Sequence, residues 1–127
     1  MSCLIADGLS KVKNAILTGR EEVKIRKSNF IHKVFEVMCQ EGFFNGVSIV
    51  DGDIVISLKY DNFGIPVIRK LSMVSKPSRR IYLGKSELSK LRKKRFSLLV
   101  LSTSEGVMSD VEAYNRGIGG EIVCEVY

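Results

Sequence analysis

Apolar residues in the first half of the chain recur at helical and then at strand spacing. Positions 4–17 carry six at intervals of one to four residues, which predicts an amphipathic helix ended by Gly19. These six residues are Leu4, Ile5, Leu9, Val12, Ile16 and Leu17. Positions 22–26 alternate charged and apolar side chains, which is typical of a short, half-buried strand.

A second helix and a hairpin are predicted next. Ser28 is a candidate N-cap, and the helix that follows ends at Gly42. Its apolar face is formed by Ile31, Val34, Phe35 and Met38. Two alternating segments, 44–50 and 54–60, flank a turn at 51–53 and predict a β-hairpin.

The second half is predicted to be mainly β. Residues 62–66 break the pattern, and extended segments are expected at 67–74, 81–83, 98–101 and 121–126. Short helices are expected at 86–91 and after Ser109, which forms a capping box with Glu112. The fold class is therefore α+β, with two small lobes: an N-terminal αβαββ lobe over 1–65 and a mainly β lobe with short helices over 66–127.

Positive charge is concentrated in one segment of the second lobe. Of the 20 lysines and arginines, 11 lie between Arg69 and Arg95, together with a single acid, Glu87. The first 68 residues carry 8 bases and 8 acids, and the last 32 carry 1 base and 5 acids. Such a distribution predicts that one region meets a polyanion, most commonly nucleic acid.

Composition narrows the class of protein further. No apolar run approaches the roughly 18 residues that span a membrane, no N-terminal secretion signal is visible, and no long amphipathic basic helix suggests a membrane binder. The three cysteines are far apart in the sequence, so we expect buried thiols, no metal site, no cofactor and a reducing, cytoplasmic location.

Two segments could contact RNA. Lys76, Arg79 and Arg80 flank Pro77 and precede Tyr82, so the cations could clamp phosphates while the ring stacks, although a solvated loop beside a core tyrosine is the alternative. Residues 92–95 form a second, weaker basic cluster.

The second segment is a hydroxyl turn, Ser102-Thr103-Ser104, followed by Gly106. It could read base edges or ribose hydroxyls, but a turn that caps itself is the alternative that spacing alone favours.

Catalysis is not expected. The serines lie outside a GxSxG motif, and His32, the only histidine, falls in a predicted helix of the other lobe. Asp51 and Asp53 fit a hairpin turn better than a metal site. A small serine hydrolase is thus disfavoured, whereas a free-standing RNA-binding regulator stays open.

Several motifs together resemble one family. Residues 102–110, with the sequence STSEGVMSD, and 117–123, with the sequence GIGGEIV, closely resemble the C-terminal signature of the bacterial-type small-subunit ribosomal protein S8 family. Residues 5–15, 40–43 and 75–82 resemble its opening helix, the end of its second helix and its basic loop.

The resemblance implies a non-enzymatic component of the small ribosomal subunit. Family members bind a helix in the central domain of the small-subunit rRNA early in assembly, adjoin neighbouring small-subunit proteins as monomers, and in some bacteria repress their own operon's messenger RNA. Their strongest RNA contacts come from the hydroxyl turn. The RNA-binding residues implied here are Lys11, Lys13, Asn14, Ser28, Lys76, Pro77, Arg79, Arg80, Tyr82, Ser102, Thr103, Ser104, Gly106, Gly119, Gly120 and Glu121.

Several positions depart from the family pattern. Lys11 and Lys13 stand where arginines are usual, which exchanges bidentate forks for point charges. Asn29 replaces a basic residue, and Ser78 and Arg79 replace a pair that is usually rich in glycine. Glu105 would repel a phosphate unless its carboxylate points away.

Overall fold

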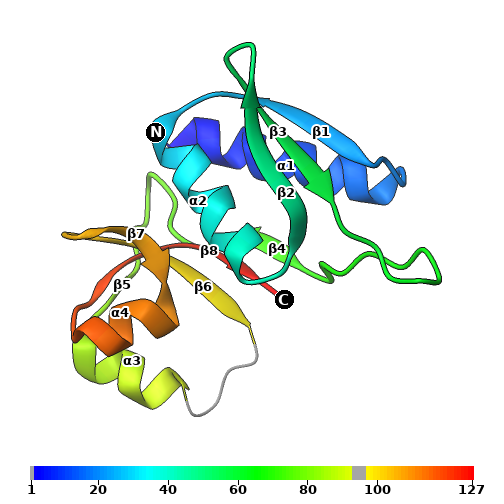
Figure 1. Ribbon diagram of the computed structural model, residues 1–127. Coiled ribbons are helices and arrows are strands. Elements are labelled where there is room, and N and C mark those ends of the chain that lie inside the picture. Colours follow the sequence, from blue (N-terminus) through cyan, green and yellow to red (C-terminus); the bar gives the residue numbers. More distant parts are fainter. Residues whose placement is uncertain (1, 93–96) are drawn as a thin grey trace.

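The computed structural model describes residues 2–92 and 97–127, with side chains described for 5–90 and 97–127. Its elements are α1 (Ser2–Leu17), β1 (Glu22–Arg26), α2 (Asn29–Gln40), β2 (Phe44–Val50), β3 (Asp53–Leu58), β4 (Leu71–Met73), β5 (Tyr82–Leu83), α3 (Lys85–Arg92), β6 (Leu98–Thr103), β7 (Gly106–Ser109), α4 (Asp110–Arg116) and β8 (Gly120–Val126) (Figure 1). The predicted α+β class with two lobes is confirmed. No helix in these ranges is long and apolar enough to cross a membrane.

The elements form two antiparallel sheets with helices between and beside them. The first sheet has the strand order β1-β3-β2, and the second has β4-β8-β6-β7, with β5 also paired to β8. Helix α1 contacts β1 and β4, while α2 contacts β2, β6 and β7, so both lie between the sheets (Figure 1). Helices α3 and α4 contact one another, and α4 covers the other face of the second sheet. That sheet therefore has one face toward α1 and α2 and one toward α3 and α4.

The larger hydrophobic core is shared by the two halves of the chain. Phe35 and Ile54 from the first half belong to the same buried cluster as Leu71, Val100 and Val126 from the second. A smaller cluster, which includes Leu88 and Leu101, lies under α3 and α4. Because burial of apolar surface is the main stabilising term, the shared core fixes how the two sheets face one another. The division after residue 65 stays a prediction.

The helix faces follow the sequence pattern with one exception. All four predicted apolar positions of α2 are buried, as are Ile5, Leu9 and Val12 of α1. Leu17 was predicted on the same face of α1, and this is wrong: it is 83% exposed. Successive helical residues are rotated by about 100°, which turns the final residue of α1 away from the stripe that Ile16 continues.

Turns and caps explain the element boundaries. Asp51 and Gly52 have φ values of 51° and 82°, the positive pair that a tight hairpin turn requires. Ser109 caps α4 as predicted, because its Oγ accepts the amide of Glu112 at 3.1 Å. Three predicted strands are shorter than expected: the one over 54–60 ends at Leu58, the one over 81–83 begins at Tyr82, and only Leu71–Met73 of 67–74 is a strand.

Candidate nucleic-acid interface

Side chains from four strands form a row across the second sheet. Tyr82 pairs with Glu121, which pairs with Ser102, which pairs with Val107. Directly opposed residues in antiparallel strands point to the same face, and neighbouring strands are about 4.8 Å apart. An exposed aromatic ring, a carboxylate and a hydroxyl therefore lie in a line about 10 Å long.

The basic loop meets this row at a small cavity of about 70 Å³. The cavity is lined by Ile5, Phe30, Ser75, Arg80, Ser102, Glu121 and Val123. Both carboxylate oxygens of Glu121 lie 3.3 Å from Nη1 of Arg80. Ile5 and Phe30 lie near the starts of α1 and α2, so the row faces the side of the sheet that carries these helices. The structure thus brings the predicted basic loop and hydroxyl turn together on one side of the molecule.

The basic loop is a tight, anchored turn. The amide of Lys76 donates to Arg79 O at 2.9 Å, and the amide of Arg79 donates to Lys76 O at 3.0 Å. Because opposed residues share a face, the two exposed side chains project together. At the base of the loop, Ser75 Oγ accepts the amide of Ile81 at 2.9 Å. Tyr82 is 64% exposed, which overturns the alternative of a core tyrosine.

The three hydroxyls of the turn differ in their hydrogen bonding. Thr103 Oγ1 donates to Gly106 O at 2.7 Å and accepts the amide of Glu105 at 3.1 Å, so it caps its own turn. Within the described residues, Ser102 and Ser104 make no side-chain hydrogen bond, and Ser104 is exposed. Gly106 has a φ of 117°, which a residue with a side chain rarely adopts. The hydroxyls available to a ligand are therefore those of Ser102 and Ser104.

The start of α2 borders the cavity through Phe30. Ser28 is the N-cap residue in an extended conformation, and its side chain makes no capping hydrogen bond. The first amides of a helix have no acceptor within the helix and favour anions. Phe30, in the first turn of α2, lines the cavity, whereas Ser28 is not among its lining residues.

Residues of α1 line a second, separate groove. Lys11 and Asn14 border an open hollow of about 580 Å³ between α1 and β1, together with Arg20 and Lys24. Lys11 lies six residues after Ile5, which lines the first cavity, and this spacing separates the two along α1 by about 9 Å. Lys13 is rotated about 160° from Lys11 and points elsewhere. The predicted residues of this helix therefore do not act at one place.

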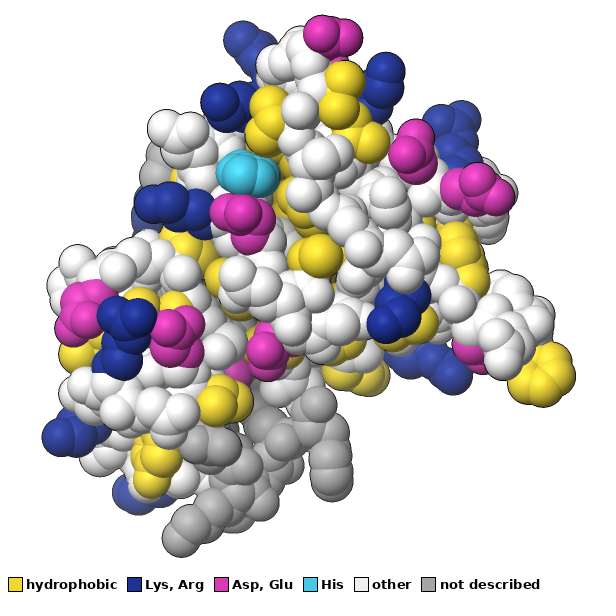
Figure 2. All heavy atoms as spheres, viewed as in Figure 1, with side chains coloured by type: hydrophobic (Ala, Val, Ile, Leu, Met, Phe, Trp, Pro, Cys, Tyr) yellow, Lys and Arg dark blue, Asp and Glu magenta, His cyan; other side chains and the backbone are white. Residues whose placement is uncertain are grey.

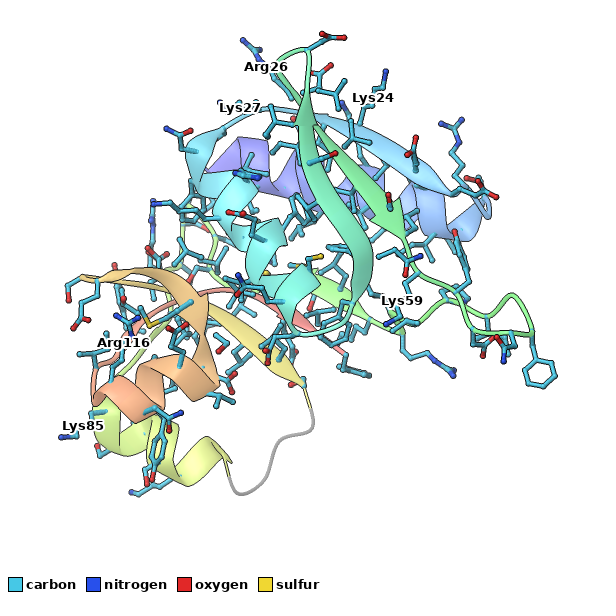
Figure 3. The ribbon with its side chains drawn as sticks, viewed as in Figure 1. Lys24, Arg26, Lys27, Lys59, Lys85 and Arg116 are labelled. Atoms are coloured by element: carbon cyan, nitrogen blue, oxygen red, sulfur yellow. The ribbon has the colours of Figure 1, made fainter. Side chains whose placement is uncertain are left out.

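Sequence reasoning missed the cations of β1. Lys24, Arg26 and Lys27 lie close together along and just after this edge strand (Figure 3). Acidic residues nearby in the sequence balance the charge of these cations, so the count of charges did not single them out. The alternation of charged and apolar residues over 22–26 was the signal that could have identified them. Of the predicted second basic cluster, residues 93–95 and the side chain of Arg92 lie outside what the structure describes.

Comparison with known proteins assigns the family. A family model described as ribosomal protein S8 matches residues 4–127. This chain belongs to the ribosomal protein S8 family. The protein named small ribosomal subunit protein uS8 from Nitratidesulfovibrio vulgaris is 38% identical over 123 residues, covering 97% of this chain and 96% of that protein. Proteins of the same name are 36% identical in Nautilia profundicola, covering 100% and 99%, and 34% identical in Campylobacter hominis, covering 98% and 97%.

The paired glycines of the S8-like signature serve close strand packing. A β-carbon on Gly120 would lie 2.6 Å from Ser102 O, and one on Gly119 would overlap Leu83 O. Both obstacles are backbone atoms, which cannot swing away as the end of a side chain can. Glycine is needed at positions 119 and 120 because β8 lies very close to β5 and β6 there. This close approach also sets the position of Glu121.

Two departures from the S8 pattern are accommodated. Among the described residues other than glycine, only Asp51 has a positive φ, so Ser78 fits its turn without that strain. Glu105 Oε1 lies 2.9 Å from Nη1 of Arg116, whose Nη2 lies 2.9 Å from Glu112 Oε1 (Figures 2 and 3). These contacts, the hydrogen bond with Glu105 first, raise the pKa of Arg116. Because α4 covers the opposite face of the sheet, Glu105 is held away from the row.

The chemically reactive side chains of the S8 chain are separate from the row. Burial raises the pKa of the Cys124 thiol to about 12, so this thiol stays protonated at neutral pH. Nδ1 of His32 lies 3.6 Å from Glu36 Oε1 on the same helix. Neither residue lines the cavity beside Ser102.

Proposed function

We propose that this protein is a structural, non-catalytic component of the small ribosomal subunit that binds small-subunit rRNA through the second sheet. Its target is a helix in the central domain, bound early in assembly. The observation that carries the proposal is the row of Tyr82, Glu121 and Ser102 beside Arg80, in a chain whose relatives are named small ribosomal subunit proteins. Assembly into ribosomes would place it in the cytoplasm.

Cationic side chains and uncharged polar or aromatic side chains have different roles in the proposed RNA binding. Lys76, Arg79 and Arg80 are exposed cations that suit backbone phosphates, which fix position without reading sequence. Ser102 and Ser104 offer free hydroxyls that can both donate and accept, and Tyr82 offers a ring for an unstacked base. Such a surface fits an irregular RNA helix, where bases and ribose hydroxyls are accessible.

Glu121 has an indirect part in this arrangement. A carboxylate repels phosphate, but both of its oxygens lie 3.3 Å from the Arg80 guanidinium. Exposed ion pairs contribute little stability, typically about 0–1 kcal/mol. We therefore assign Glu121 to orienting Arg80 toward the cavity rather than to contacting the RNA backbone.

Crosslinking in assembled particles tests the proposal. Protein and small-subunit rRNA are irradiated, and the crosslinked peptides are mapped to single residues. We expect crosslinks in 76–82 and 102–104, from one RNA region. Co-sedimentation with small subunits at high salt separates this role from that of a free-standing RNA-binding regulator, which would stay at the top of the gradient. Binding to the operon's messenger RNA, if it uses the same surface, should compete with the rRNA.

Ser104→Ala should remove selectivity with little change in electrostatic binding. The substitution deletes an exposed hydroxyl but no charge, so we expect affinity for the cognate rRNA element to fall about tenfold, as one lost hydrogen bond of roughly 1.5 kcal/mol predicts. Affinity for a plain RNA duplex and the dependence on salt should not change. Filter binding at several salt concentrations measures both, with Ser48→Ala on β2 as the matched control. Equal weakening toward both RNAs would contradict the assignment.

Arg80→Ala should have the opposite pattern. Loss of one phosphate contact should weaken binding to cognate element and plain duplex alike, and the slope of log affinity against log salt should become shallower by about 1. The same measurement applies, with Lys59→Ala, at the base of a loop outside the row, as control. An unchanged slope combined with lost selectivity would show that the two roles had been exchanged.

A further inference from the structure

The loop after β3 is an ordered arm that projects from the body of the protein. We call residues 59–67 the arm. The amide of Val67 donates to Lys59 O at 3.0 Å, and the amide of Asp61 donates to Ile65 O at 2.8 Å. Tyr60 and Pro66 form a bridge between its two sides. The arm lies at the opposite end of the molecule from the β6–β7 hairpin (Figure 1).

The apex of the arm holds an aromatic side chain in solvent. Asp61 Oδ1 accepts the amides of Phe63 at 2.8 Å and Ile65 at 2.9 Å. Phe63 is 88% exposed and Ile65 is 43% exposed. Figure 2 shows a hydrophobic side chain protruding at the end of the arm. Burying a phenylalanine is worth about 1.5–3 kcal/mol, so this pre-formed apex leaves substantial binding energy unused in the isolated chain.

The charge of the apex favours protein over nucleic acid as its partner. Residues 61–66 include one acid, Asp61, and no base. The nearest cation along the chain, Lys59, lies at the base of the arm and donates to Gly42 O at 3.3 Å (Figure 3). Aromatic side chains that stack on RNA usually act beside cations that hold the phosphates. Here a carboxylate beside Phe63 would repel them.

We propose that the arm inserts Phe63 into an apolar pocket of a neighbouring small-subunit protein, with a lysine or arginine of that protein at the rim facing Asp61. The inference rests on the proposed function, because it takes the partner from the same subunit. It assigns the two ends of the molecule to different partners. RNA binds the row at the β6–β7 end, and protein binds the arm, so both can be bound at once.

Exchange from assembled particles tests the arm. Purified small subunits carrying labelled protein are mixed with excess unlabelled protein, and the rate at which label leaves is measured. We expect Phe63→Ser to raise this rate about tenfold, since truncated interface anchors typically lose more than 1 kcal/mol. Leu17→Ser is the matched control, because Leu17 is 83% exposed and lies outside the arm. It should leave the rate unchanged.

A second variant separates charge from packing. Asp61→Asn keeps a side-chain oxygen that can accept the amides of Phe63 and Ile65 but removes the charge. We expect about threefold faster exchange at low salt and no difference from the original protein at high salt, because screening weakens the pairing with the rim cation. Equal exchange at every salt concentration would overturn the predicted rim cation.

Binding to protein-free small-subunit rRNA distinguishes protein docking by the arm from the proposed RNA-binding function. Phe63→Ser should bind this RNA as the original protein does. Weaker binding would overturn the proposal in favour of RNA stacking by Phe63, and exchange as slow as that of the original protein would overturn the docking role. Dimers of the isolated protein that Phe63→Ser dissociates would point to a second copy instead. If the original protein binds neither rRNA nor subunits, the proposed function itself fails.

Discussion

Gly120→Ala is expected to lower the free energy of unfolding by about 3 kcal/mol, the upper part of the range for overpacked sites. The new β-carbon would lie 2.6 Å from Ser102 O and 2.8 Å from Thr103 Cγ2. The first contact is with backbone, so β8 and β6 must move apart where they carry Glu121 and Ser102. Urea denaturation followed by circular dichroism measures the loss. RNA binding should fall with it, although no side chain of the row has been replaced.

Gly46→Ala is the matched control. No heavy atom lies within 4 Å of the β-carbon position at Gly46, and its backbone has no positive φ. We expect a change within about 0.5 kcal/mol, as at most surface sites. If Gly120→Ala were equally mild, the close approach of β8 to β6 would not be what the glycine provides.

Tyr82→Ala has the largest effect that we expect on RNA binding without a change in stability. Stacking of one base on an aromatic ring contributes about 1–3 kcal/mol, which corresponds to roughly fivefold to more than a hundredfold in affinity. Because Tyr82 is 64% exposed, the midpoint of thermal unfolding should stay almost unchanged. Fluorescence anisotropy with a labelled rRNA fragment measures the affinity.

Two further substitutions separate the contribution of the Tyr82 ring from that of its hydroxyl. Tyr82→Phe keeps the ring and should retain most of the affinity, whereas Tyr82→Leu keeps bulk without the π-face and should resemble Tyr82→Ala. Full affinity in Tyr82→Ala would remove the aromatic end of the row from the RNA surface. Equal losses in Tyr82→Phe and Tyr82→Ala would assign the contact to the hydroxyl instead of the ring.

The sequence predicted the hydroxyl turn but not the role of each hydroxyl within it. Three consecutive hydroxyls before a glycine indicated a turn that could cap itself or bind a ligand. The first interpretation is confirmed for Thr103, which bonds within the turn, whereas ligand binding by the exposed Ser104 stays a prediction. Neighbouring side chains on a strand point to opposite faces, so spacing alone could not assign the roles until the partners of each face were known.

The sequence by itself determined the helices and the first hairpin. Periodicity located α2 and its buried face because a helix repeats its contacts every three or four residues, and Asp51-Gly52 marked a hairpin because few residues accept a positive φ. Only the tertiary structure decided which residues form the candidate interface. The pairing of β5, β8 and β6 joins Tyr82, Glu121 and Ser102, which are far apart along the chain, and the same packing puts Lys11 in a separate groove. Strand order and register are set by burial over the whole shared core, so no single segment of the sequence contains them.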